Sequence, residues 1–175
     1  MLKIELQSER LQFCSLTKKH LNQVYRLHSL PQVAQYNTIG IPKNIAVTHN
    51  VLLGKLDPSN FAEHGWVLFD QEGLFIGEMG LVLAPERFRK AEISYSIHPN
   101  CWNYGYATEA VERLIRFAFD TLQLHRIEAG VAVSNKASIR VLEKAGLQRE
   151  GRHRKILPLR EGWEDNYSYG ILSFD

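Results

Sequence analysis

The residues with the clearest chemical use form one run, Pro99-Asn100-Cys101-Trp102-Asn103-Tyr104-Gly105-Tyr106-Ala107-Thr108. Gly105 lets the backbone approach a ligand closely, and Ala107 keeps a second approach point small. The free N–H groups of a first helical turn, with the positive end of the helix dipole, form an anion site. The run therefore predicts a turn that holds a pyrophosphate through backbone amides. An ordinary strand-to-helix connection with a glycine is the alternative reading.

Two further stretches resemble a known family together with this run. AEISYSIHPNCWNYGYATEA is similar to the signature of the GNAT N-acetyltransferase superfamily, in the RimJ/RimL-like branch that acetylates ribosomal protein N-termini. SNKASIRVLEKAGLQREG resembles the family's next strand-to-helix element, and GRHRKILPLREGWEDNYSYGIL resembles its closing hairpin. The resemblance is specific in residues 91–151 and implies one N-acetyltransferase domain over residues 8–173.

The resemblance implies an enzyme that moves the acetyl group of acetyl-CoA directly to a primary amine in a ternary complex. Acetyl-CoA is then a co-substrate, and no metal is needed. A ribosomal-type protein N-terminus is the acceptor that the branch implies. A small amine, such as a polyamine or an aminoglycoside, is the alternative, and use of a longer acyl-CoA stays open. The rival from another class is a non-catalytic regulatory domain that binds acyl-CoA.

The family's pattern Gln/Arg-x-x-Gly-x-Gly/Ala implies which residues hold the coenzyme. Trp102 takes the first position, a departure from the general pattern, while Gly105 and Ala107 take the fourth and sixth. The pyrophosphate is expected on the backbone amides of Asn103, Tyr104, Gly105, Tyr106, Ala107 and Thr108. The pantetheine arm is expected along the backbone of Ser96, Ile97 and His98, and the amide of Ser96 or Ile97 is expected to polarise the thioester carbonyl.

The resemblance also implies a residue near the coenzyme sulfur. Asn135 matches an asparagine that contacts the coenzyme arm, and it is equally suited to cap a helix. Ser138 matches a serine that could donate a hydrogen bond to the leaving thiolate; a first-turn serine bonded to the backbone is the alternative. Many members carry a tyrosine general acid four residues later, where this chain has Leu142. Ser138 or water must then protonate the thiolate.

The general base is expected on the central strand. Glu92 is the carboxylate on the polar face of segment 91–98, and a partly buried glutamate can be tuned to accept a proton near neutral pH. A structural glutamate paired with Arg87 or Arg89 is the alternative. A water relay to His98 or Asp165 is a further route.

Composition excludes several other classes of protein. The 175 residues suit one domain, and a net charge of +2 is too small to indicate nucleic acid as the main partner. No apolar signal segment opens the chain and no apolar run reaches a membrane span, so a cytoplasmic protein is expected. The two cysteines form no disulfide framework, and the seven histidines show no metal-binding spacing. A homodimer is compatible with the sequence but no residue compels it.

The surrounding elements are expected to place these residues in one α/β (α+β) domain. Hydrophobic periodicity predicts strands at 10–15, 66–70, 74–84, 91–98, 126–133, 147–153 and 166–173. Helices are expected after Thr17, at 44–56, from 105 to about 122, and from 135 to Gly146. This order predicts a mixed, mostly antiparallel central sheet with helices on both faces. By resemblance, strands 91–98 and 126–133 are parallel neighbours that splay apart. Segments 30–62 and 153–165 are expected to shape the acceptor side, the latter as a loop.

Overall fold

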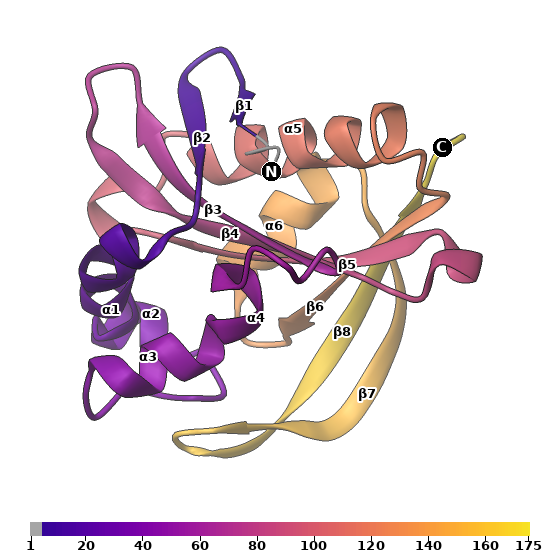
Figure 1. Ribbon diagram of the computed structural model, residues 1–175. Helices are drawn as coiled ribbons and strands as arrows, with labels where there is room; N and C mark the ends of the chain where they lie inside the picture. The colour runs from indigo at the N-terminus through magenta and orange to yellow at the C-terminus, as the bar shows by residue number, and fades with distance from the viewer. Residues whose placement is uncertain (1–4) are drawn as a thin grey trace.

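The computed structural model describes residues 5–175 and contains one eight-stranded sheet. The strand order is β1-β2-β3-β4-β5-β6-β8-β7, and every neighbouring pair is antiparallel except β5 and β6 (Figure 1). The strands are β1 (Leu6–Gln7), β2 (Leu11–Ser15), β3 (Glu63–Asp70), β4 (Phe75–Leu83), β5 (Lys90–Ile97), β6 (Arg126–Ala132), β7 (Gln148–Leu159) and β8 (Gly162–Leu172).

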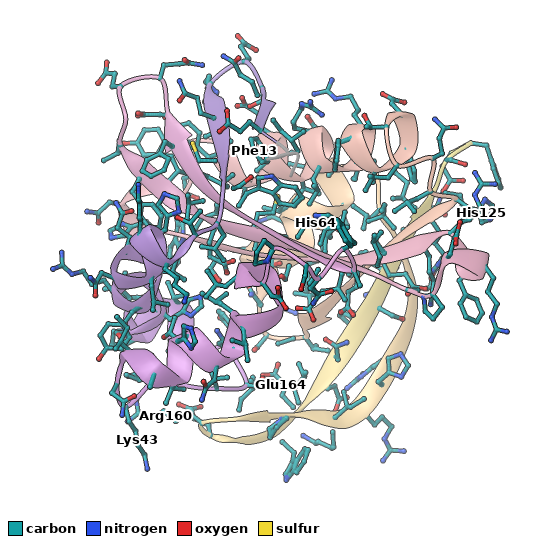
Figure 2. The ribbon with its side chains drawn as sticks, in the orientation of Figure 1. Phe13, Lys43, His64, His125, Arg160 and Glu164 are labelled. Atoms are coloured by element: carbon teal, nitrogen blue, oxygen red, sulfur yellow. The ribbon has the colours of Figure 1, made fainter. Side chains whose placement is uncertain are left out.

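Helices cover both faces of the sheet. Helices α5 (Tyr106–Asp120) and α6 (Lys136–Lys144) lie on one face, which we call the α5–α6 face (Figure 1). Four short helices cover part of the other, the α1–α4 face: α1 (Leu21–His28), α2 (Pro31–Ala34), α3 (Ile45–Val51) and α4 (Leu53–Leu56). The β7–β8 hairpin extends past β6, with Arg160 at its turn (Figure 2).

Alternation along the strands divides the core between these two faces. In β3, Trp66 and Leu68 belong to the large apolar cluster that includes the buried side of α5. Val67, between them, belongs to a smaller cluster with Leu16, Val24 and Leu52. Because successive strand residues point to opposite faces, one strand supplies both cores. Phe13 of β2 belongs to the large cluster, and its label lies beside α5 in Figure 2.

The parallel pair β5–β6 is joined along only part of its length. Lys90, Ala91 and Glu92 pair with Arg126, Ile127 and Glu128, and no pairing continues beyond them. Farther along, β5 keeps β4 as its neighbour to Ile97, and β6 keeps β8 to Ala132. The two strands therefore leave an opening between 93–97 of β5 and 129–132 of β6.

The predicted fold class is confirmed, with its mixed sheet, helices on both faces and splayed parallel pair. Several local predictions were wrong. Thr17 caps the short 3-10 turn Lys18–His20, whereas α1 begins after His20. Segment 153–165 is almost entirely strand, because β7 runs to Leu159 and β8 starts at Gly162. Strand β1 and helix α2 were not predicted, since two to four residues are too few to show a period.

None of the described helices has the length and apolar character needed to cross a membrane. The longest, α5, carries its buried residues on one side only and exposes charged residues on the other.

Replacing Gly77 by alanine should destabilise the fold beside the opening. The new methyl group would overlap the backbone carbonyl of Ser96 and lie 3.0 Å from the Ile97 Cα, so β5 would have to shift. We expect Gly77→Ala to lower the free energy of unfolding by about 1–3 kcal/mol, as overpacking commonly does, measured by urea denaturation. Gly151→Ala is the control, because its methyl would meet only the rotatable Ser168 hydroxyl. Equal unfolding midpoints for the two variants would contradict this prediction.

Candidate active site

The predicted phosphate turn lies between β5 and α5, at the open end of the strand pair. Asn103 and Gly105 both have left-handed backbone conformations, with φ of 67° and 83°. Gly105 is the N-cap of α5, and no side chain caps this helix end. The Glu109 amide donates to the Gly105 carbonyl at 3.1 Å and so closes the first turn of the helix. In the described part of the chain, the amides of residues 103–108 have no hydrogen-bond acceptor, so they can bind an anion.

A network from the first strands holds this turn in place. The Glu109 carboxylate accepts hydrogen bonds from the Ser8 hydroxyl at 2.7 Å and from the Arg10 amide at 2.8 Å. The Arg10 guanidinium donates to the same carboxylate at 2.7 Å and to the Tyr104 carbonyl at 2.9 Å. It also lies 4.8 Å from the centre of the Tyr106 ring. We call Ser8, Arg10 and Glu109 the latch; sequence reasoning missed it because its members are about a hundred positions apart.

The latch is ionised at neutral pH. Burial alone would raise the pKa of Glu109, but the hydrogen bonds from Arg10 and Ser8 and the Arg10 charge together hold that pKa below its ordinary value. The resulting contribution to stability is complete above the ordinary value of 4.5 and is lost as the pH falls through the lower folded-state pKa.

Trp102, the departure from the family pattern, has a structural role here. Its indole N–H donates to the Ile97 carbonyl at 2.8 Å, which ties the turn to the last residue of β5. The side chain remains 40% exposed, so it is also accessible to a ligand.

Of the two amides expected to polarise the thioester carbonyl, those of Ser96 and Ile97, only one faces the opening. The His98 amide donates to the Ile76 carbonyl of β4 at 2.8 Å. Since hydrogen-bonded and non-bonded pairs alternate along antiparallel strands, the Ser96 amide, opposite Glu78, also faces β4. The Ile97 amide, opposite Gly77, then faces the opening. Ile97 is therefore the donor best placed to polarise a thioester carbonyl there.

Ser138 lies on the α5–α6 face and touches β5 across the opening. Its hydroxyl is 2.7 Å from the Tyr95 phenol oxygen, and either group can donate. Asn135 is the N-cap of α6, and its side-chain oxygen accepts from the Ser138 amide at 3.1 Å. The capping role of Asn135 is thus present, and it also fixes the position of Ser138.

Tyr95 is a candidate catalytic residue that the sequence analysis did not single out. It is the one residue with a hydroxyl on the face of β5 formed by Ala91, Ile93 and Ile97, which was the available signal. Burial raises the pKa of Tyr95 to about 12, although its hydrogen bond with Ser138 opposes the shift, so the phenol keeps its proton at neutral pH. Leu142, at the position where many family members carry the tyrosine general acid, is only 1% exposed and packs in the large core.

The two carboxylates expected to take part in proton transfer differ in their surroundings. Glu92 is exposed and has no ion-pair partner among the described residues; Arg87 lies over the Phe88 ring and Arg89 bonds the Gln123 carbonyl. The alternative pairing of Glu92 with either arginine is therefore not observed. Asp165, the other expected relay residue, is occupied: the Lys155 amide and the Arg152 guanidinium lower its pKa.

Other groups near the site are engaged or inert. Burial, with the Asp70 charge, raises the pKa of the Cys101 thiol, which disfavours the thiolate needed for covalent catalysis. Arg113 and Lys136 already donate to the carbonyls of Gln7 and Val133. Within residues 5–175, no cluster of three or more His, Cys, Asp or Glu residues could hold a metal.

Breaking the latch should weaken coenzyme binding. We expect Glu109→Ala to raise the Kd for acetyl-CoA about 10-fold, because Arg10 would no longer hold the Tyr104 carbonyl. Titration calorimetry measures this, with Glu112→Ala, on the same helix and exposed, as the control. The ratio of the Kd values of Glu109→Ala and the control should not change between about pH 6 and 8, since Glu109 of the control is ionised throughout this range. Equal affinities for the two variants would show that the latch does not support the turn.

Comparison with known proteins identifies the family. The acetyltransferase (GNAT) domain model matches residues 10–148. The uncharacterised N-acetyltransferase p20 of Bacillus licheniformis is 27% identical over 169 residues, covering 95% of each chain. The uncharacterised N-acetyltransferase YnaD of Bacillus subtilis (strain 168) is 41% identical over 81 residues, so the match spans 46% of this chain and about half, 48%, of that relative.

Solved structures share the whole fold. An acetyltransferase (GNAT family) from Bacillus anthracis matches with a TM-score of 0.85 and 26% identity over 98% of this chain and all, 100%, of that one. Spermidine N-acetyltransferase from Vibrio cholerae, in complex with CoA and spermine, matches with a TM-score of 0.85 and 22% identity over 95% of this chain and 98% of that one. The chain therefore belongs to the acetyltransferase (GNAT) family and carries an acetyl-CoA-dependent N-acetyltransferase domain.

Proposed function

We propose that residues 8–173 transfer the acetyl group of acetyl-CoA directly to a primary amine in a ternary complex. One observation supports this proposal above the others. The free backbone amides of residues 103–108 lie next to the opening between β5 and β6, and the Ile97 amide faces that opening. This geometry best supports a coenzyme whose pyrophosphate binds the free amides and whose acyl arm lies in the opening.

The reaction in this proposal balances without a covalent intermediate. The amine nitrogen attacks the thioester carbon, a C–N bond forms, and the carbonyl oxygen becomes an oxyanion beside the Ile97 amide. Removing one such donor commonly costs about 3–4 kcal/mol of transition-state stabilisation. The oxyanion then collapses, the C–S bond breaks, and CoA leaves as a thiolate.

Ser138 and Tyr95 supply the proton for the departing thiolate in this mechanism. Their hydroxyls are 2.7 Å apart, so the proton that Ser138 donates can be replaced from the Tyr95 phenol. A pKa of about 12 keeps that phenol protonated at the pH of the reaction, and solvent returns the proton to Tyr95 after each transfer. Together they take the place of the tyrosine that Leu142 replaces.

Glu92 is the proposed general base, acting through water. It is exposed on the α1–α4 face and is the last residue of β5 that pairs with β6. Glu92 stands five residues before Ile97 in the same strand. It is therefore too far from an amine bound beside Ile97 to contact it directly. A water on the same face would carry the proton from the amine to Glu92.

A protein N-terminus of the ribosomal type is the proposed acceptor, as expected for a RimJ/RimL-like member. The putative ribosomal N-acetyltransferase YdaF of Bacillus subtilis (strain 168), 34% identical over 101 residues, supports this choice. A polyamine is the second candidate, supported by the likeness to the Vibrio cholerae spermidine N-acetyltransferase.

The function is tested by following release of the CoA thiol with a panel of amines. We expect release with acetyl-CoA and a peptide that carries a free N-terminus, and mass spectrometry of the peptide should show one added acetyl group. Preference for spermidine would indicate that the acceptor is a polyamine. Preference for propionyl- or succinyl-CoA would indicate that the enzyme transfers a longer acyl group. Binding of acetyl-CoA with no release beyond slow hydrolysis, for every amine tested, would indicate the regulatory domain instead.

Substitutions at the hydroxyl pair should slow turnover without weakening coenzyme binding. We expect Ser138→Ala and Tyr95→Phe each to lower kcat at least 10-fold, within the range typical of lost general-acid catalysis, with the Kd for acetyl-CoA changed less than twofold. Ser173→Ala, on the exposed last segment, is the control. Unchanged turnover in Ser138→Ala would remove this serine from the mechanism.

A further inference from the structure

We infer that the buried carboxylate of Glu78 is the binding site for the ammonium group of the acceptor, on the α1–α4 face beside the opening. This inference rests on the proposed amine transfer and names the group that recognises the amine.

Glu78 occupies the row of the sheet that leads to the opening. On β4 it pairs with Val67 of β3 on one side and with Ser96 of β5 on the other. Val67 belongs to the core beneath α1 and α4, so Glu78 and Ser96 point to the α1–α4 face. Ser96 directly precedes Ile97, whose amide faces the opening. The carboxylate therefore lies one strand away from the expected position of the thioester, on the face opposite α5 and α6.

Only one of the two carboxylate oxygens of Glu78 has a hydrogen-bond partner. The residue is 5% exposed, and Oε1 contacts the His28 Nε2 of α1 at 3.5 Å. Burial alone would raise the pKa of Glu78, but the His28 contact, the Lys55 charge and the Ser96 side chain lower it below the ordinary value. Oε2 has no hydrogen-bond partner. A buried carboxylate oxygen without a hydrogen-bond donor is costly, and an ammonium supplies the missing donor.

All three orphaned side-chain atoms found in residues 5–175 belong to this face. They are Glu78 Oε2 on β4, His28 Nδ1 on α1 and Thr48 Oγ1 on α3. Helix α1 packs on both α3 and β4, so the three elements form one assembly. Unpaired polar groups are rare in native structures and each calls for an explanation. A polar ligand bound beneath α1 would give a hydrogen-bond partner to Glu78 Oε2, the orphaned atom that lies beside the opening.

The protein's own Lys55 shows that this face accepts a primary ammonium. Its Cβ lies beside Gly65 and the end of its side chain lies over Gly80, where an added methyl group would overlap the Lys55 Nζ. The Nζ donates to the Ser94 hydroxyl at 3.2 Å. Ser94 lies two residues before Ser96 on the same face of β5. An alkyl chain with a terminal ammonium therefore already lies along the row next to Glu78. A substrate amine of the same shape would lie alongside it, one row closer to Ile97.

This arrangement predicts a charge requirement in the acceptor. The acceptor binds with its amine protonated, whether that amine is the N-terminus of a peptide or one end of a polyamine. An acceptor that is uncharged at neutral pH, such as hydroxylamine, gains nothing from Glu78.

The test compares Glu78→Gln with wild type in the CoA-release assay. We expect the KM for the preferred alkyl amine to rise at least 10-fold, while the Kd for acetyl-CoA and the rate with hydroxylamine change less than twofold. Glu72→Gln, in the exposed β3–β4 turn, is the matched control and should behave as wild type. The thermal unfolding midpoint of each variant, with and without saturating amine, adds a second measurement; the amine should raise it in wild type but not in Glu78→Gln.

Three outcomes separate the inference from the function beneath it. A wild-type enzyme that acetylates no amine would overturn the proposed function itself. An active wild type together with an unchanged amine KM in a folded Glu78→Gln variant would overturn only the inference. Equal losses for charged amines and for hydroxylamine would also overturn it, because they would indicate a general structural defect rather than loss of a cation site.

Discussion

The incomplete pairing of two parallel strands is the constraint on which the rest of this structure depends. β5 and β6 share only three residue pairs before they part, and each then keeps its antiparallel outer neighbour. The inner edge of β5 is left with backbone groups that a sheet would normally satisfy. An extended acyl arm can satisfy them as a missing strand would, and the opening admits it from one face while the other face stays accessible to an amine.

The two faces of the opening differ in chemistry because side chains alternate along β5. On the α5–α6 face, Tyr95 meets Ser138, and both stay neutral and able to donate a proton. On the α1–α4 face, Ser96 lies beside the ionised Glu78. One strand thus separates an environment suited to a leaving thiolate from one suited to an incoming cation. One carboxylate oxygen of Glu78 has no hydrogen-bond partner in the free protein, and a bound ammonium would supply one.

The phosphate turn is held by elements from opposite ends of the sequence. The latch joins the β1–β2 hairpin to the first turn of α5, and the Trp102 indole joins the turn to β5. A free helix end exposes amides that water would otherwise solvate. Fixing the backbone before the ligand arrives reduces the entropy that binding must overcome. The β1–β2 edge of the sheet therefore contributes to the proposed coenzyme site.

The sequence alone determined the fold class, the two strand-to-helix turns and the position of Asn135 and Ser138, because these depend on local period and on residues adjacent in the chain. It did not determine partners that are far apart along it. Tyr95 was not singled out, because alternation shows on which face of the strand a residue lies but not which helix packs against it. Glu78 and His28, and likewise Glu109 and Arg10, meet only after the sheet and its helices assemble. Burial decided which carboxylate stays charged without a full set of partners, and burial is a property of the tertiary structure.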